Sequence, residues 1–151
     1  MSELENQPVF RSFEFDKPAR TLLRSQNLPV SDLPGEQITF YELLHEKKRV
    51  AIGATQFLEK EGLLRSVAVD PKAQNRGYGS KLVKRLMDVA REESLQELYL
   101  LTTTAEGFFE KFGFCTLNRD QTPTSIRSTE EFRSLCSESA VLMAKQLEHE
   151  E

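Results

Sequence analysis

The sequence predicts a mixed α/β (α+β) domain, in which helices flank one sheet of mostly antiparallel strands. Three observations predict this class. Three strand patterns follow one another from residue 38 to residue 69 with short polar turns between them, as in an antiparallel meander. A glycine-containing turn and a long amphipathic helix come next. Strand and helix patterns then alternate to the C-terminus, and we expect residues 1–151 to form a single domain.

One strand and one helix precede the meander. Residues Val9 to Phe15 alternate apolar and polar side chains, which predicts a strand. Asp16 stands where it can cap a helix from Lys17 to Gln26, and Pro18 in the first turn costs that helix no hydrogen bond. Two prolines punctuate the segment 27–35, which predicts a loop.

Two polar turns divide the meander. The first is Glu46 to Arg49, and the second is Glu59 to Gly62, where we expect the glycine to take a positive φ. The third strand, Leu63 to Val69, is apolar on both faces apart from Arg65 and Ser66. This pattern predicts a central strand that is covered on both sides.

The second half of the chain alternates helices and strands. A helix is predicted from Gly79 to Glu93, because an apolar stripe runs along it among basic residues: Leu82, Val83, Leu86, Met87 and Ala90. The later predicted elements are a strand over 96–104, a helix over 105–113 ended by Gly113, a strand over 114–117, a helix over 129–138 and a strand over 140–147. Ser128 and Glu131 have the spacing of a capping box.

Composition limits the functions to consider. The chain of 151 residues is 38% hydrophobic with a formal net charge of −4, which argues against nucleic acid as the main partner. It has no apolar run that would span a membrane and no signal-peptide pattern, so we expect a cytoplasmic protein. Cys115 and Cys136 lack metal-ligand spacing, and we expect small core residues and no metal site.

The turn from Gln74 to Ser80 is the main candidate site. Its order Gly79-Ser80-Lys81 is not that of a nucleoside triphosphate P-loop, and Leu82 stands where a dinucleotide fingerprint needs a small residue. An ordinary strand-to-helix turn remains open. Two glycines at a helix N-terminus nevertheless form an anion site suited to a pyrophosphate. Charges stand close by at Lys72, Arg76 and Lys81, either as part of that site or as a solvated rim.

Two segments resemble signatures of the Gcn5-related N-acetyltransferase (GNAT) family. The segment VAVDPKAQNRGYGSKLV resembles the family's acetyl-CoA signature, whose core of Gln/Arg-x-x-Gly-x-Gly/Ala is matched by Gln74, Gly77 and Gly79. The segment AEGFFEKFGF is similar to the second signature. The resemblance implies the GNAT fold with splayed central strands, and direct transfer of an acetyl group from acetyl-CoA to an amine by a monomer or homodimer.

The resemblance also implies the residues that hold the cofactor. Backbone amides of the turn would grip the CoA pyrophosphate, and the backbone of Val67 and Val69 would pair with the pantetheine arm. The Val69 N–H would stabilise the thioester oxyanion as the amine attacks. The implied cofactor set is Val67, Ala68, Val69, Gln74, Asn75, Arg76, Gly77, Tyr78, Gly79, Ser80, Thr102 and Phe109.

The second signature departs from the family pattern at two places. Phe109 replaces the usual Tyr, whose hydroxyl protonates the leaving thiolate in many relatives, and a phenyl ring cannot do so. Water, another group or unassisted departure remains open. Thr102, Thr103 and Thr104 replace an Asn that often precedes this signature. Their hydroxyls bond the CoA arm, or they are strand residues followed by a helix cap at Thr104.

Arg65 is the candidate for contact with the acceptor. By strand alternation its side chain shares a face with Val67 and Val69. A buried arginine needs an anionic partner. The partner is an internal carboxylate such as Glu42 or Glu59, or it is an anionic group of a small acceptor.

The C-terminal third resembles, more narrowly, acetyltransferases found with arsenic-resistance genes, which act on arsenic- or phosphorus-bearing amino-acid analogues. The match runs through Arg65, Ser66, Arg119, Pro123, Thr129, Phe132 and Cys136. It implies a small anionic acceptor held by Arg65 and Ser66. Arg119 and Arg127 are further anion-binding groups or exposed loop charges.

The general base is the least determined part of the site. Glu59, Glu42 and His45 are candidates by position, with a water relay to a carboxylate as the alternative. We name two catalytic residues, Val69 for its N–H and Glu59 as the base. Two other functions stay open. One is a CoA-binding module that has lost transfer, and the other is a peptide or protein N-acetyltransferase with a groove at the loop 27–35.

Overall fold

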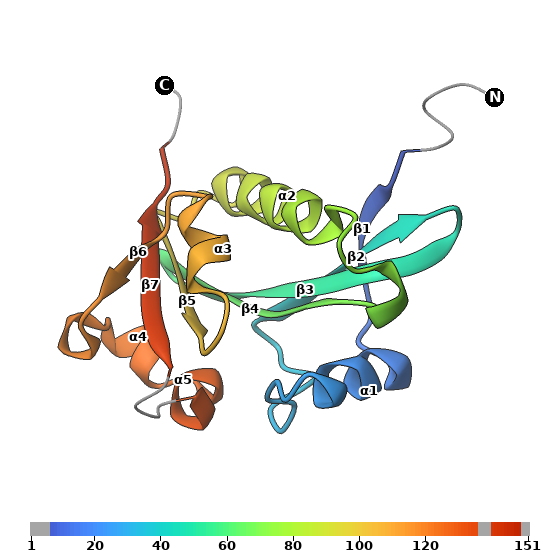
Figure 1. Cartoon of the computed structure of the whole chain (residues 1–151). Coiled ribbons are helices and arrows are strands. Elements are labelled where there is room, and N and C mark those ends of the chain that lie inside the picture. Colours follow the sequence, from blue (N-terminus) through green and yellow to red (C-terminus); the bar gives the residue numbers. More distant parts are fainter. Residues whose placement is uncertain (1–6, 136–139, 149–151) are drawn as a thin grey trace.

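Seven strands form one sheet in the order β1-β2-β3-β4-β5-β7-β6 (Figure 1). The structure is a computed structural model that describes residues 7–135 and 140–148. Its strands are β1 (Val9–Phe13), β2 (Ile38–His45), β3 (Lys48–Leu58), β4 (Glu61–Val69), β5 (Glu97–Thr102), β6 (Cys115–Leu117) and β7 (Val141–Gln146). Its α-helices are α1 (Lys17–Ser25), α2 (Tyr78–Glu92), α3 (Glu106–Glu110), α4 (Thr124–Arg127) and α5 (Glu130–Leu135).

The pairing confirms a mixed, mostly antiparallel sheet. Strands β1 to β4 are antiparallel neighbours in chain order, as the predicted meander requires. Strand β4 is central, and its pairing with β5 is parallel. Strand β7 then runs antiparallel between β5 and β6. The sequence did not predict α4, a short helix in the segment between β6 and β7.

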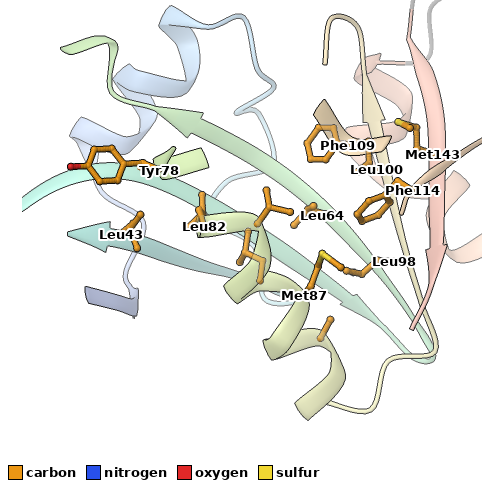
Figure 2. Close-up of a cluster of buried hydrophobic side chains, with 14 of the residues drawn as sticks. Leu43, Leu64, Tyr78, Leu82, Met87, Leu98, Leu100, Phe109, Phe114 and Met143 are labelled. Atoms are coloured by element: carbon orange, nitrogen blue, oxygen red, sulfur yellow. The ribbon is translucent and has the colours of Figure 1, made fainter. Parts of the chain in front are cut away.

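Helices cover both faces of the sheet. Helices α2 and α3 lie on one face, and α1, α4 and α5 lie on the other (Figure 1). The apolar stripe of α2 is buried as predicted, and it packs on the sheet with residues such as Leu64, Leu98 and Phe114 (Figure 2). The opposite face carries two separate apolar clusters, one centred on α1 and the other including Ile126 and Phe132 of α4 and α5.

Helix α1 begins as the sequence predicts. The Asp16 side chain accepts a hydrogen bond from the N–H of Ala19 at 2.9 Å, and so caps the helix. Arg49 of β3 donates to both carboxylate oxygens of Asp16, at 2.7 and 3.0 Å, and this hydrogen bond lowers the pKa of Asp16 against the effect of burial. The cap therefore also ties α1 to the sheet.

Two local predictions are wrong. Glu59, not Gly62, takes the positive φ of the second turn, at 53°. Gly62 instead lies in β4, where a Cβ would come within 2.5 Å of Leu95, so its role is close packing. Cys115 is exposed rather than part of the core, while Cys136 lies outside the described residues.

The predicted capping box at α5 is also wrong. Thr129 rather than Ser128 caps the helix, since its hydroxyl accepts from the N–H of Phe132 at 3.1 Å. The Ser128 hydroxyl donates to the carbonyl of Thr124. Glu131 is buried, and its role is described with the site.

Candidate functional site

Strands β4 and β5 pair over only part of their length. The parallel ladder joins Glu61–Leu63 to Glu97–Tyr99, and no pairing with β5 follows beyond Leu63 in the described register. Strand β4 continues to Val69, still paired with β3. One edge of β4 is therefore left without a strand partner from Leu64 onward, which is the splayed arrangement that the family resemblance implies.

A β-bulge lies in β4 at this divergence. Ala54 of β3 pairs with Arg65 and Ile52 pairs with Ala68, so Gly53 alone is opposite two residues of β4. Ser66 takes the left-handed conformation there, with φ of 58°. The extra residue shifts every following side chain of β4 to the other face of the sheet.

The bulge overturns the predicted face of Arg65. Val67 lies on the α2 face, since its Cγ2 is 3.4 Å from where a Cβ on Gly53 would stand, beside Leu82 and Leu86. Arg65 pairs with Ala54, which packs in the cluster on the α1 face. Simple alternation fails because it does not include the extra residue at the bulge.

The backbone of β4 after the bulge faces the open edge. The N–H of Asp70 donates to the carbonyl of Val50 on β3 at 2.8 Å. Because successive residues of a strand direct their N–H and C=O to opposite sides, those of Val69 and Val67 point toward β5. The Val69 carbonyl accepts from Gln26 Nε2 at 2.9 Å, so the C-terminal end of α1 reaches this edge.

The turn after β4 leaves the start of α2 open. Asn75 and Gly77 have φ of 65° and 81°, and a Cβ on Gly77 would meet nothing within 4 Å. Gly77 is the N-cap of α2, and no side chain accepts a hydrogen bond from the first turn. The first amides of a helix have no intrahelical partner, so this turn presents N–H donors and partial positive charge to an anion. The charged side chains of Lys72, Arg76 and Lys81 are exposed around it.

Two contacts hold this turn against the sheet. The Tyr78 hydroxyl and His45 Nδ1 share a hydrogen bond that joins the first residue of α2 to the end of β2. His45, predicted as a candidate base, is half-buried and engaged in this contact. A Cβ on Gly79 would stand 3.5 Å from Val69 and 3.6 Å from Phe108. Gly79 therefore faces the space between the end of β4 and α3.

The residues of the second predicted signature lie beside the open edge. Thr102 is buried at the end of β5, and its hydroxyl accepts from the N–H of Ala105 at 2.9 Å. A helix cap at Thr104, one of the two alternatives for these threonines, is excluded because Ala105 is the N-cap of α3. Thr103 and Thr104 are exposed. Phe109 is buried against Phe114 in the core under α2.

Arg65 is bound by an internal carboxylate. Its Nη1 and Nη2 donate to the two oxygens of Asp32 at 2.6 and 2.7 Å, and Nη1 also donates to Gln56 Oε1 at 3.1 Å. Nε lies 3.4 Å from the Ser66 hydroxyl. The internal carboxylate is therefore Asp32, and the suggested partners Glu42 and Glu59 are wrong. The sequence gives no sign that the loop between α1 and β2, which carries Asp32, reaches Arg65.

Glu131 completes this cluster, which we call the Arg65 cluster: Asp32, Gln56, Arg65, Ser66 and Glu131. Glu131 Oε1 lies 3.6 Å from Arg65 Nη2 and has no hydrogen-bond partner. Burial raises the pKa of Glu131 to about 7; Arg65 lowers it and Asp32 raises it further. Sequence reasoning missed this residue, because the only signal at Glu131 was its apparent place in a capping box.

The other carboxylates predicted as bases are placed elsewhere. Glu59 is exposed in the turn between β3 and β4, at the opposite end of β4 from Val69. Val69 comes eight positions after Glu61 along the strand, which corresponds to about 26 Å. Glu42 is held by Arg11 at 2.7 Å and Arg49 at 2.8 Å. Glu59, a predicted candidate base, and Val69 therefore lie at opposite ends of β4.

Arg119 and Arg127, the two arginines that the sequence suggested as further anion-binding groups, contact backbone carbonyl oxygens. Arg119 Nη2 donates to the carbonyl of Ala140 at 2.7 Å, just before β7. Arg127 Nη2 lies 3.4 Å from the carbonyl of Arg119. Within residues 7–135 and 140–148, no cluster of three metal-ligating side chains occurs, and no helix is long and apolar enough to cross a membrane.

Comparisons with known proteins find relatives over most of the chain. The model of the acetyltransferase (GNAT) family matches residues 6–114. An amino-acid acetyltransferase of Mycobacterium tuberculosis is 34% identical over an alignment of 110 residues that covers 66% of this chain and 60% of the relative. The ribosomal protein bS18-alanine N-acetyltransferase of Escherichia coli is 27% identical over an alignment of 131 residues that covers 83% of this chain and 88% of the relative.

A solved structure matches most of the chain. The N-acetylglutamate synthase of Neisseria gonorrhoeae, complexed with coenzyme A and N-acetyl-glutamate, superposes with a TM-score of 0.76 at 24% identity, covering 94% of this chain. This likeness confirms the predicted fold. The chain spans 60% of the length of the mycobacterial relative and 35% of the synthase, less than two thirds of either.

Proposed function

The chain belongs to the acetyltransferase (GNAT) family, and on this basis we propose that it transfers the acetyl group of acetyl-CoA to the amino group of a small acceptor. One observation carries the proposal. The open edge of β4 after Leu63 leads directly to an uncapped helix N-terminus at Gly77. An extended backbone edge and a set of free amides are what a pantetheine arm and a pyrophosphate need.

The residues present fit this cofactor. Gly77 leaves open space at the turn, so backbone N–H groups can approach a phosphate closely. Val67 and Val69 present backbone groups along the open edge, and Gly79 leaves the passage between β4 and α3 free of a side chain. Lys72, Arg76 and Lys81 add positive charge around the turn. Asn75, Tyr78 and Ser80 complete the predicted pyrophosphate turn.

The cofactor supplies an activated acetyl thioester, and the protein positions the reacting groups. The Val69 N–H lies on the open edge, where it would donate to a bound thioester oxygen and would stabilise the negative charge that develops as an amine attacks. Holding the amine and the thioester together removes much of the entropic cost of the reaction. Phe109 has no proton to give, so the thiolate takes its proton from water or another group.

The acceptor proposed is an amino acid or a close analogue. This class is supported by the names of relatives, an amino-acid acetyltransferase and an N-acetylglutamate synthase. Arg65 supports it less than the sequence suggested, because Asp32 already binds the guanidinium. The arsenic- and phosphorus-bearing analogues rest only on the resemblance of the C-terminal third, and they form the narrower hypothesis within the same class.

Two measurements test the proposal. Calorimetry should show that acetyl-CoA binds the purified protein. Thiol release should then accelerate with members of a panel that contains free amino acids, amino-phosphinic and amino-arsonic analogues, and short peptides. Turnover of free amino acids supports the proposal. Binding without turnover across the panel supports a CoA-binding module. Turnover of peptides alone supports a peptide or protein N-acetyltransferase, and the E. coli relative is named a ribosomal protein bS18-alanine N-acetyltransferase. A protein that binds no acetyl-CoA contradicts all three. Cytoplasmic location and a monomeric or homodimeric state stay predictions.

A further inference from the structure

The Arg65 cluster is a buried polar group between apolar clusters. On the face of the sheet that carries α1, α4 and α5, one apolar cluster includes Ala54 and Ala68, and the other includes Leu63. Arg65 follows Leu63 and pairs with Ala54, so the cluster lies between the two. Arg65 and Glu131 are 2% exposed, so their charges are almost removed from water. Burying such charges lowers the stability of the fold unless each charge is paired and hydrogen-bonded, so an incompletely paired group calls for a functional explanation.

The hydrogen bonds of the cluster leave one oxygen unpaired. Arg65 directs Nη1 to Asp32 and Gln56, and Nη2 to Asp32. Glu131 Oε1 is 3.6 Å from Nη2, which is an ion-pair distance and too long for a hydrogen bond. Glu131 Oε1 has no hydrogen-bond partner. Water does not supply one readily, because only 3% of the Glu131 side chain is exposed. The cluster thus offers one cation to two carboxylates and leaves a hydrogen-bond acceptor unused.

The unpaired oxygen lies where the two central strands part. Leu63 is the last residue of β4 that pairs with β5, and Arg65 comes two residues later. Helix α5, which carries Glu131, packs against β5. Glu131 is therefore positioned under the divergence of β4 and β5, on the face opposite α2. A thioester that enters from the α2 side along the edge of β4 would meet an acceptor from this face.

We propose that Glu131 is the general base of the acetyl transfer, which the sequence did not identify. The inference rests on the proposed function. The Glu131 carboxylate takes one proton from the acceptor's ammonium, directly or through one water, and the freed lone pair attacks the thioester carbon. The C–N bond forms, the C–S bond breaks, and the amide nitrogen loses a second proton to the CoA thiolate or to solvent. Glu131 then releases its proton to solvent.

The surroundings of Glu131 suit this role. The charged groups that act on it are Arg65 of β4 and Asp32 of the loop before β2. On β5, Glu97 and Tyr99 share this face by strand alternation. Tyr99 shares an apolar cluster with Phe132 of α5, and burial, together with the nearby carboxylates of Glu97 and Glu61, raises the pKa of Tyr99 to about 12. Tyr99 therefore stays neutral near pH 7. With a pKa of about 7, Glu131 can accept a proton at the operating pH and release it again.

The test compares Glu131→Gln with Glu131→Asp and with Glu130→Gln. Glu130 is the neighbouring carboxylate on α5, is partly exposed and pairs with Arg133 at the surface, so it is the matched control. We measure kcat, KM and the pH–rate profile with an amino acid that the wild type acetylates, and the acetyl-CoA affinity by calorimetry. Glu131→Gln should lower kcat by about 100-fold or more, remove the acidic limb near pH 7 and leave acetyl-CoA affinity unchanged. Glu131→Asp should keep that limb with reduced kcat, and Glu130→Gln should match the wild type.

Three outcomes would overturn the inference. If Glu131→Gln keeps kcat within a few-fold and the same acidic limb, the carboxyl has only a structural role. If Glu131→Gln does not fold, Glu131→Asp decides, because a profile without the acidic limb in that variant also excludes the base. If the wild type binds acetyl-CoA but acetylates nothing, the proposed function fails and this inference fails with it. That result is distinguishable from failure of the inference alone, in which the wild type is active and Glu131→Gln keeps the same kcat.

Discussion

Arg65 and Asp32 form a forked ion pair in which Nη1 and Nη2 meet the two carboxylate oxygens at 2.6 and 2.7 Å. This pair joins the loop between α1 and β2 to the centre of the sheet at the bulge of β4. The Arg65 side chain is fully buried and that of Asp32 is 19% exposed, so water does little to weaken the contact. The residue that the sequence suggested for the acceptor is thus first a structural link.

Arg65→Ala should destabilise the protein by about 3–5 kcal/mol, because it leaves Asp32 and Glu131 without their cation in a buried place. Urea unfolding measures the loss. Arg91→Ala is the control, because Arg91 pairs with Asp88 at the surface and its loss should cost less than about 1 kcal/mol. A stable Arg65→Ala protein with only a raised KM for the acceptor would instead favour direct contact of Arg65 with substrate.

Glu131→Gln should become more stable relative to the wild type as pH rises. The pKa of Glu131 is raised from 4.5 to about 7 in the fold, so the folded state prefers the neutral carboxyl. The free energy of unfolding of the wild type therefore falls by up to about 3 kcal/mol as pH rises from about 4.5 to about 7, because the folded state must give up a proton that it binds more tightly. A glutamine at this position does not titrate, so the variant has no such loss. Melting temperatures of both proteins near pH 5 and pH 8 measure the difference. A pH-independent difference would contradict the raised pKa.

Gly79→Ala should weaken acetyl-CoA binding without harming the fold. The new Cβ would make ordinary contacts with Val69 and Phe108, at 3.5 and 3.6 Å, and alanine favours a helix by about 1 kcal/mol over glycine. The methyl group would nevertheless occupy the passage beside β4. Calorimetry with acetyl-CoA checks this, and Asp88→Ala on the exposed face of α2 serves as control. Unchanged affinity would place the cofactor elsewhere.

Tyr78→Phe should loosen the start of α2. It removes the hydroxyl that is hydrogen-bonded to His45, at a cost of about 1 kcal/mol in unfolding free energy. We expect a several-fold weaker affinity for acetyl-CoA, because the first amides of α2 lose their anchor to β2. Tyr41→Phe makes the same chemical change on β2, where the ring stacks on Phe10. If both variants bind acetyl-CoA like the wild type, the contact does not position the turn.

Much of the fold follows from local sequence signals. The meander, the central place of β4 and the buried stripe of α2 follow from apolar periodicity, because a half-buried element must repeat its apolar residues with the period of its backbone. The cap at Asp16 follows from one residue in its ordinary place. The glycines around Gly77 correctly indicate an open turn before α2.

The Arg65 cluster could not be predicted in the same way. A β-bulge has no reliable local signal, and one extra residue at Ser66 reversed the face assigned to Val67 relative to Arg65. The partners Asp32 and Glu131 come from segments 33 residues before and 66 residues after Arg65. Contacts between such distant segments depend on how loops and short helices pack, which no local pattern records.

Incubation of the wild-type protein with acetyl-CoA and a single free amino acid tests the central claim most directly. The released CoA thiol is measured while mass spectrometry identifies the product. We predict an N-acetylated amino acid that forms in equal amount to the thiol, for at least one member of the panel, and only with protein present. Tight binding of acetyl-CoA without any acetylated product, across amino acids, their arsenic and phosphorus analogues and peptides, would contradict the claim.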